Sequence, residues 1–250
     1  MNTIEEVFKK PGTVLGTWVT MTDPTVIEFA KLAGFDFVRL DNEYFPFDIN
    51  MIEQMIRTAN SIGLPIIVRV SRLEDISMFI SCGADGIMIP DGTYERAKET
   101  VERVKYAPLG KRSMFMKSRA VRVSGLNFKE YHKQANNHVS VTVQIEDPKG
   151  MADIDKILSL EGVDFVASGR ADISQVLSVP GETDHPKVDE FEDAVIKKAL
   201  EYKKIPMLMV APNKAAQEKL LQKGVHVMVI CSDYEFMFNG MQAAIKEMRK

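Results

Sequence analysis

The 250-residue sequence is poor in features that mark particular classes of protein. Its two cysteines, Cys82 and Cys231, show neither a short metal-binding spacing nor the disulfide framework of a secreted domain. The first residues contain no apolar signal region, and no apolar run approaches the roughly 20 residues that cross a bilayer. We therefore expect a cytoplasmic protein with no membrane partner.

An excess of charge of one sign is also missing. Lysine and arginine together number 32, aspartate and glutamate 35, and the formal net charge is -3. Such a balance gives no electrostatic reason to expect nucleic acid or an anionic membrane as a partner. No linker rich in proline, glycine or serine divides the chain, so we expect one domain over residues 1–250.

One unit recurs along the sequence: an amphipathic helix pattern closed by a glycine, followed by a short strand with little polar alternation. The closing glycines are Gly34, Gly83, Gly162 and Gly224. Strands without polar alternation are buried on both faces, which implies a parallel sheet covered by helices. Eight such strands are predicted, at residues 14–19, 35–40, 65–70, 84–89, 139–145, 163–167, 206–210 and 225–230.

Eight strands alternating with helices predict an α/β fold, a (β/α)8 TIM barrel. A doubly wound open sheet is the alternative, but it usually has fewer strands, and no glycine-rich dinucleotide turn follows the first strand here. Residues 91–138 are too many for one helix and one loop. We expect an insertion after the fourth strand, beginning with a helix at 94–105 and lying at the C-terminal mouth of the barrel.

The barrel predicts that one rim collects the polar side chains that end or follow its strands. Glu146 ends the fifth strand and Asp172 follows the sixth, and two such carboxylates suit Mg²⁺ or Mn²⁺, with water and substrate completing the site. A lone glutamate at a strand end is more often a helix cap or a surface ion pair, but the second acid and Arg69 favour the metal. The other polar residues of this rim are Asp41, Asn42, Glu43, Tyr44 and Gln144.

Several motifs together resemble the HpcH/HpaI aldolase/citrate lyase family. They are Asp41-x-Glu43, Val68-Arg-Val-Ser71, Tyr106-x-Pro-x-Gly-x-Arg112, Gln144-Ile-Glu146, Gly169-x-Ala-Asp-Ile-Ser174 and His185-Pro-Lys-Val188. Each is weak alone, but their order and spacing are specific. The resemblance implies a barrel of the phosphoenolpyruvate/pyruvate type and a hexamer built as a trimer of dimers.

The resemblance also implies roles for the rim residues. Glu146 and Asp172 would bind the metal, with Co²⁺ as a further candidate. Arg69 would lie beside the 2-oxo group, and the substrate carboxylate would lie on the backbone amides of Ala171 and Asp172, as suits a helix N-terminus. We place Gln144 with the substrate-binding residues, and Asp41, Glu43 and Tyr44 with Arg69 in the catalytic group.

The sequence departs from the family at the catalytic base. Tyr44 stands where the family has histidine, and Ser81 where the partnering aspartate falls; Arg170 replaces a common proline. A phenol with an ordinary pKa of about 10 is a poor base near neutrality. Aldol cleavage must remove an alcohol proton, whereas decarboxylation of a β-keto acid reaches the same enolate without a base. The departure favours decarboxylation, or an aldol reaction in which water or substrate is the base.

The sequence thus predicts an enzyme, a divalent-metal-dependent carbon-carbon lyase that acts on a small 2-oxo acid through a pyruvate enolate. One alternative is a decarboxylase of oxaloacetate-type β-keto acids or a citrate-synthase-like variant. Another is a non-catalytic protein that binds 2-oxo acids and kept the pocket after losing its base.

Overall fold

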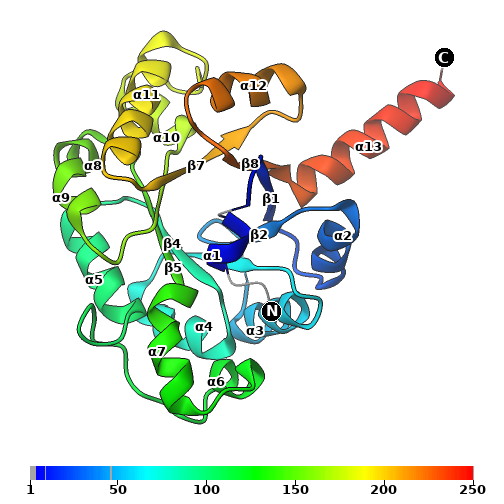
Figure 1. Cartoon of the computed structure of the whole chain (residues 1–250). Helices are drawn as coiled ribbons and strands as arrows, with labels where there is room; N and C mark the ends of the chain where they lie inside the picture. The colour runs from blue at the N-terminus through cyan, green and yellow to red at the C-terminus, as the bar shows by residue number, and fades with distance from the viewer. Residues whose placement is uncertain (1–3, 9, 46, 250) are drawn as a thin grey trace.

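A closed barrel of eight parallel strands forms the centre of the protein (Figure 1). The computed structural model describes residues 4–8, 10–45 and 47–249. The predicted barrel is confirmed, and each strand begins and ends within two residues of its expected bounds. The strands are β1 (Val14–Val19), β2 (Phe37–Asn42), β3 (Ile66–Val70), β4 (Gly86–Ile89), β5 (Ser140–Gln144), β6 (Phe165–Ala167), β7 (Ile205–Val210) and β8 (Val227–Ser232).

Alternate residues of each strand face the barrel interior or the surrounding helices. In β5, Val141 and Val143 belong to the large apolar core between strands and helices, so Thr142 and Gln144 point inward. A second apolar cluster fills the interior near the N-terminal ends of the strands and includes Phe37, Ile67 and Phe165. Both faces of the strands are therefore buried, which explains why their sequences lack polar alternation.

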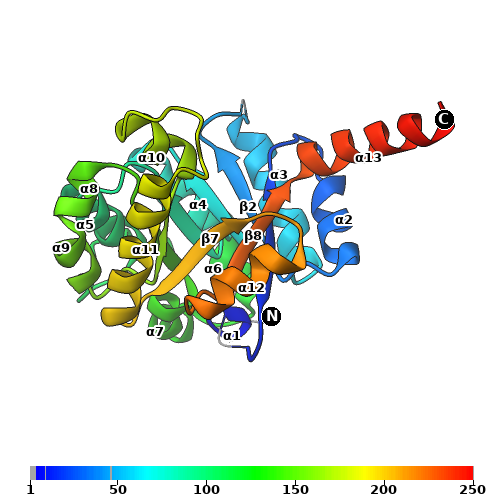
Figure 2. The ribbon, with the colours of Figure 1, turned by 90° about the horizontal axis from the view of Figure 1, so that it is seen from above.

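Helices surround the barrel, as expected from the repeated unit (Figure 2). Gly34 and Gly83 adopt the left-handed conformation at helix ends, as predicted, and Gly224 has a positive φ just past one. The prediction for Gly162 is wrong, because the preceding helix ends at Ser159 and a Cβ on Gly162 would overlap Val101. The outer helices are α2 (Thr25–Ala33), α3 (Ile49–Ser61), α4 (Ile76–Cys82), α5 (Tyr94–Val104), α8 (Pro148–Ala152), α9 (Ile154–Ser159), α10 (Arg170–Val176), α11 (Pro186–Glu201) and α12 (Lys214–Gln222).

The N-terminal end of the barrel is closed by a short helix, α1 (Ile4–Phe8). The ring of Phe8 packs against those of Phe37 and Phe165, with centroids 4.9 and 4.7 Å apart. This helix was not predicted, because five residues are too few to show a helical period. With one end plugged by apolar side chains, the opposite end is the one open to a ligand.

The segment 91–138 contains the expected helix α5 and two more, α6 (Arg119–Ser124) and α7 (Phe128–His138). The expectation that this whole insertion lies at the C-terminal mouth is wrong. Arg119 donates to the carbonyl of Cys82, just before β4 begins, and α7 contacts α1 and leads directly into β5. Figure 2 shows α7 and α1 at the same end, away from α10. The insertion therefore thickens the closed end of the barrel.

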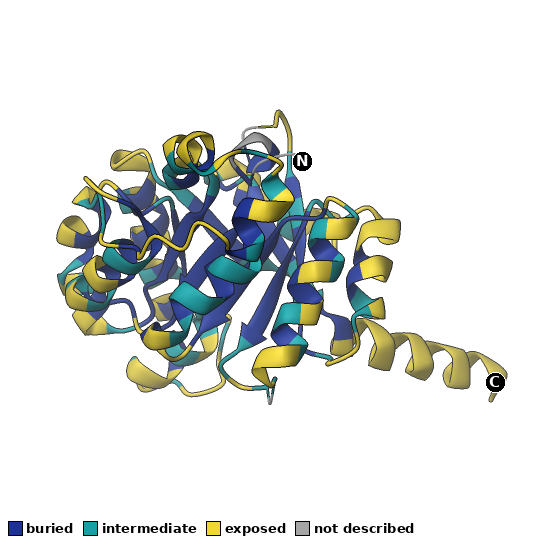
Figure 3. Ribbon diagram, turned by 90° about the horizontal axis from the view of Figure 1, so that it is seen from below, coloured by how far each residue is buried: buried dark blue, intermediate teal, exposed yellow. Residues whose placement is uncertain are grey.

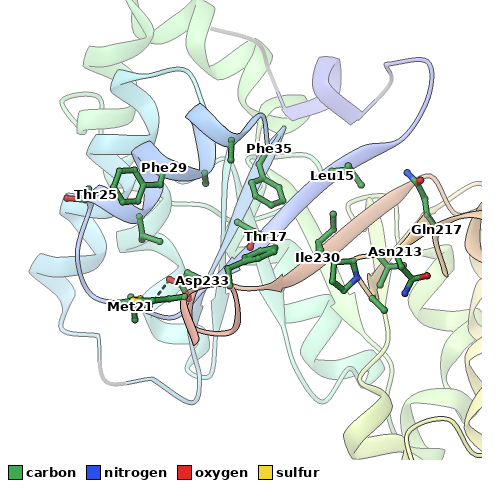
Figure 4. Close-up of a pocket in the computed structure, with 18 of the residues that line it drawn as sticks. Leu15, Thr17, Met21, Thr25, Phe29, Phe35, Asn213, Gln217, Ile230 and Asp233 are labelled. Carbon is green, nitrogen blue, oxygen red and sulfur yellow. Dashed lines mark hydrogen bonds between the residues drawn. The ribbon is translucent and has the colours of Figure 1, made fainter. Parts of the chain in front are cut away.

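The last helix, α13 (Asp233–Met248), projects away from the barrel and is exposed along almost its whole length (Figures 1 and 3). Its start is fixed, since Asp233 accepts hydrogen bonds from the amide and hydroxyl of Thr20. Beside it lies an apolar groove of about 990 Å³ between α2 and α12 (Figure 4). The groove is lined by Leu15, Phe29, Phe35, Pro212, Ile230 and Phe236, among others. None of the described helices is long and apolar enough to span a membrane.

Candidate active site

The open end of the barrel carries a cluster of charged side chains centred on Arg69. Asp41 and Arg69 are register partners on β2 and β3, so both side chains point into the barrel. Nε and Nη2 of Arg69 donate to the two carboxylate oxygens of Asp41, at 2.8 and 2.9 Å, and Nη1 lies 3.0 Å from Glu43 Oε2. The sequence placed these three residues on one rim, and the structure joins them in one network.

The network keeps Arg69 charged although its side chain is only 4% exposed. Burial opposes the charge, but the hydrogen bonds and the negative charge of Asp41, helped by Glu43, raise the pKa of Arg69 above its ordinary value. At Glu43, burial also disfavours the charged form, and there it raises the pKa. The bidentate contact fixes the plane of the guanidinium and leaves the remaining hydrogens of Nη1 and Nη2 for a ligand.

The two proposed metal ligands, Glu146 and Asp172, meet at Gly169. A Cβ added to Gly169 would overlap Glu146 Oε2 and lie 3.3 Å from Asp172 Oδ2, so both carboxylates flank the space left by its missing side chain. Glu146 follows β5 and Asp172 lies in the first turn of α10, after β6. The ends of two adjacent strands therefore bring these acids together.

Glu146 is held in a setting that disfavours its own charge. It is 4% exposed, and burial raises its pKa to about 7, with the charges of Asp172 and Asp91 adding to the rise. One carboxylate oxygen accepts a 2.9 Å hydrogen bond from the amide of Asp91, and the other accepts one from Gln144 Nε2. In the described part of the chain, no lysine, arginine or histidine forms an ion pair with Glu146 or Asp172.

A pair of carboxylates, one buried and one half-buried, without a cationic partner in the described chain fits a divalent cation. The described residues contain no cluster of three or more histidine, cysteine, aspartate or glutamate side chains placed to hold a metal. Glu146 and Asp172 would therefore supply two oxygen ligands, and water and substrate would complete the coordination. Such open positions are typical of sites where Mg²⁺ or Mn²⁺ contacts a substrate.

Sequence reasoning missed the part that Asp91 plays in this arrangement. Asp91 has a φ of 50°, a left-handed conformation that is uncommon outside glycine, and this turn aims its amide at Glu146. The Asp91-Gly92 pair directly after β4 was the available sign of a tight turn. Gly92 cannot be larger, because a Cβ there would lie 2.6 Å from the carbonyl oxygen of Gln144.

Tyr44 lies at the same end but is poorly suited to accept a proton. Its ring is 62% exposed and stacks on the Arg69 guanidinium, whose carbon lies 5.0 Å from the ring centroid. Partial burial, together with the charges of Glu43 and Asp172, raises the pKa of Tyr44 to about 12. Ser81 lies near the end of α4, at the closed end of the barrel, so within one chain it cannot partner Tyr44.

Arg170, which stands where the family commonly has proline, does not turn its charge toward the carboxylate pair. Its guanidinium pairs with Asp189 and Glu192 on α11 and donates to the carbonyl of Thr183. Ser168 donates a 2.6 Å hydrogen bond to the same Glu192. These contacts fix the start of α10, which carries Asp172.

A second arginine, Arg39, lies inside the barrel near Arg69 and was also missed by sequence reasoning. It is 5% exposed, and its guanidinium carbon lies 4.8 Å from the ring of Trp18, on which Arg69 also stacks at 5.1 Å. The only available sign was its place in β2, two residues before Asp41, which puts both side chains on the inner face.

Comparisons with known proteins cover nearly the whole chain. The family model for the HpcH/HpaI aldolase/citrate lyase family matches residues 15–240. A hydroxypyruvate/pyruvate aldolase of Roseobacter denitrificans is 30% identical over 252 residues, which cover 98% of this chain and 97% of the relative.

Solved structures are similar over the same extent. An HpcH/HpaI aldolase from Desulfitobacterium hafniense has a TM-score of 0.93 and 26% identity, and the match covers 100% of this chain and 98% of that one. The citrate synthase SbnG has a TM-score of 0.90 and 25% identity, with coverage of 100% and 98%. The similarity therefore extends over all eight strands of the barrel.

Proposed function

The chain belongs to the HpcH/HpaI aldolase/citrate lyase family, and from this premise we propose that it is a divalent-metal-dependent carbon-carbon lyase. Its substrate would be a small 2-oxo acid that reacts through a pyruvate enolate. The observation that carries the proposal is the pair of carboxylates of Glu146 and Asp172 at Gly169, with which no cationic side chain of the described residues forms an ion pair.

Glu146 and Asp172 would hold the metal, for which Mg²⁺ and Mn²⁺ are the first candidates and Co²⁺ another. A bound divalent ion supplies Lewis-acid polarisation of the 2-oxo group. The pKa of Glu146 near 7 means that metal binding below neutral pH must displace a proton from this side chain. Metal affinity should therefore fall as the pH drops below about 7.

The remaining rim residues would bind and orient the 2-oxo acid. Arg69 keeps free hydrogens on Nη1 and Nη2, which could donate to the 2-oxygen as negative charge develops there. The amides of Ala171 and Asp172, in the first turn of α10, are suited to the substrate carboxylate. Gln144, whose Oε1 is buried without a partner, offers an acceptor toward the same space.

The candidate reactions differ in whether they need a general base to remove a proton from the substrate. A tyrosine with a pKa near 12 stays protonated at neutral pH, so Tyr44 is a hydrogen-bond donor rather than a proton acceptor. This supports decarboxylation of an oxaloacetate-type acid, or a reaction in which water or substrate removes the alcohol proton. The likeness to a citrate synthase at 25% identity keeps carbon-carbon bond formation between an enolate and a second acid as an alternative.

The alternative to an enzyme is a non-catalytic protein that binds 2-oxo acids. It would use the same carboxylates and Arg69 and differ only in turnover. The family match and the relative named as an aldolase favour an enzyme. Release of pyruvate from any 2-oxo acid separates the two.

We also propose that the protein is a cytoplasmic homo-oligomer, a hexamer built from dimers. The projecting α13 exposes Phe236, Met241 and Ile245, and the apolar groove lies beside its base (Figure 4). Exposed apolar surface of this size usually marks an interface. The occupant that we propose for the groove is α13 of a second copy, because it exposes apolar side chains that an apolar groove could cover.

The metal assignment is tested by Glu146→Gln, which keeps the shape of the side chain and removes its charge. In a thermal melt, metal at about 100 times its Kd should stabilise the unmodified protein by about 2.7 kcal/mol and should not stabilise the variant. Glu99→Gln, on the exposed face of α5, is the matched control and should keep the full response. An unchanged metal response in Glu146→Gln would reject the assignment.

A further inference from the structure

Arg39 is a buried cation that lacks the partners a buried cation normally has. Its Nη1 and Nη2 approach only the sulfur atoms of Met88 and Met209, at 3.8 and 3.5 Å, and sulfur is a weak acceptor. Its Nε has no hydrogen-bond partner among the described residues. Burial, together with the nearby charge of Arg69, lowers its pKa to about 9, so it still carries its charge at neutral pH.

The neighbouring arginine is in the opposite situation. Arg69 pairs with two carboxylates, Asp41 and Glu43, so these three ionised groups together carry one negative charge. Both guanidinium carbons lie about 5 Å from the ring of Trp18, at 4.8 Å for Arg39 and 5.1 Å for Arg69. With the charge of Arg39 these groups sum to zero, but no hydrogen bond joins Arg39 to Asp41 or Glu43 in the described structure, so its N–H donors have no carboxylate acceptor.

Other polar groups on the inner face of the barrel also lack partners. Trp18 Nε1 and Thr142 Oγ1 are buried with no hydrogen bond in the described structure. Thr142 is the register partner of Met88, which Arg39 contacts, and Trp18 is the register partner of Arg39 itself. Two N–H donors and a hydroxyl without partners, beside a guanidinium that no described carboxylate accepts from, would be satisfied by an anionic oxygen.

We propose that Arg39 is a second anion-binding residue of this site, which holds a ligand oxygen beside Arg69 and makes the site prefer dianionic to monoanionic ligands. This inference rests on the proposed 2-oxo-acid site and specifies which ligands that site prefers. The ligand class is a 2-oxo acid, or an enolate-like analogue, with two negative charges. A ligand with a single carboxylate would leave the donors of Arg39 without an acceptor.

The proposal makes an unusual prediction for stability. A buried guanidinium without oxygen acceptors costs folding free energy, so an apolar residue of similar length should be tolerated or should stabilise the fold. A purely structural arginine would behave in the opposite way, because its removal would cost packing and hydrogen bonds. Arg39 is surrounded by Met88, Met209 and Trp18, so methionine is the matched replacement.

The test compares Arg39→Met with the unmodified protein, both loaded with Mn²⁺, by calorimetric titration with oxalate, a dianion, and pyruvate, a monoanion. We expect oxalate affinity to fall by about 10- to 100-fold, as for loss of a charged hydrogen bond. Pyruvate affinity should fall by no more than a few fold, and the melting temperature should be unchanged or higher. Oxalate also binds Mn²⁺ in solution. All titrations are therefore run at the same free Mn²⁺ concentration, so that this effect is the same for the two proteins.

Two controls make the result specific. Arg39→Lys keeps the charge and should recover part of the oxalate preference. Arg112→Met removes another buried arginine, which stacks on Tyr106 and Tyr131 away from the site, and should lower the melting temperature without changing the ratio of affinities.

An equal loss for both ligands, or a lower melting temperature with an unchanged ratio in Arg39→Met, would overturn the role of Arg39 and leave the proposed function standing. Failure of the unmodified protein to bind either ligand would overturn the proposed function, and this inference with it.

Discussion

At the scale of single residues, the charge network around Arg69 accounts for its proposed role. Asp41 holds Nε and Nη2 in one plane, and Glu43 holds Nη1, so the guanidinium has a single orientation at the mouth of the barrel. A lysine ammonium group would keep the charge. It could not pair with both carboxylate oxygens of Asp41, as the planar guanidinium does, and donate to a ligand at the same time. The geometry of the side chain, and not only its charge, is therefore needed.

We expect Arg69→Lys to lose most of the turnover, by about 100-fold or more, because a donor to the 2-oxygen would be misplaced. The measurement is the rate of pyruvate release at saturating metal. Arg57→Lys, an exposed arginine in the i,i+4 pair with Glu53, provides the matched control and should keep the full rate. Turnover near normal in Arg69→Lys would show that Arg69 is structural.

Sequence reasoning anticipated that the polar residues following the strands lie close together, and it missed residues whose place depends on backbone conformation or strand register. Glu146 and Asp172 were predicted because acids at the ends of buried strands are conspicuous. Asp91 was missed because its contribution is an amide hydrogen aimed by a left-handed turn. Arg39 was missed because only the register of β2 shows that it faces the interior.

At the scale of elements, the junction of β6 and α10 is built around the missing side chain of Gly169. This glycine has a φ of -117°, which any residue adopts, so its requirement is for space and not for backbone freedom. A Cβ there would overlap Glu146 Oε2 and lie 2.6 Å from Gln144 Nε2. Because Gly169 has no side chain, the carboxylates of Glu146 and Asp172 can both occupy this space.

Gly169→Ala should therefore weaken metal binding by about 10- to 100-fold, as expected when the groups that orient a metal ligand are displaced. The fold should survive, because the atoms that must move are the ends of side chains. Gly240→Ala in the exposed α13 is the control, since nothing lies within 4 Å of its added Cβ. It should leave metal affinity unchanged. Normal metal affinity in Gly169→Ala would place the metal elsewhere.

The elements themselves were predictable where their pattern was long enough. The strands show as apolar runs because both of their faces are buried, and the order of runs and helices predicts the barrel. The short α1 and the position of the insertion were not predictable. Its second half folds at the closed end because α7 must lead into the start of β5, and Arg119 attaches α6 to the end of α4.

At the scale of the whole molecule, the barrel has one plugged end, one charged end and one helix that leaves it. Apart from α13, the helices surround the barrel (Figure 1), and an apolar groove lies open between α2 and α12. Phe29 in this groove is 65% exposed and Met241 on α13 is 59% exposed. Together these surfaces support assembly with further copies of the chain.

If the groove is an interface, Phe29→Asp should reduce the assembly, because a charge would be buried against the apolar surface of the second copy. Sedimentation should show a hexamer for the unmodified protein and a smaller species for the variant. Leu221→Asp, at an exposed position of α12 outside the groove lining, should remain hexameric. Unchanged mass in Phe29→Asp would exclude the groove as an interface.

The central claim, a metal-dependent lyase that forms a pyruvate enolate without a histidine base, is tested most directly by measuring pyruvate release. The protein is incubated with Mn²⁺ and either oxaloacetate or a 4-hydroxy-2-oxo acid, and Glu146→Gln with the same metal gives the background. We predict metal-dependent release from oxaloacetate and slow cleavage of the aldol, since loss of a general base typically costs about 100- to 10,000-fold. Cleavage of the aldol at rates ordinary for an enzyme, roughly 1 to 1,000 per second, would show that a base is present after all. Pyruvate release no faster than the Glu146→Gln background from both acids would contradict the claim itself.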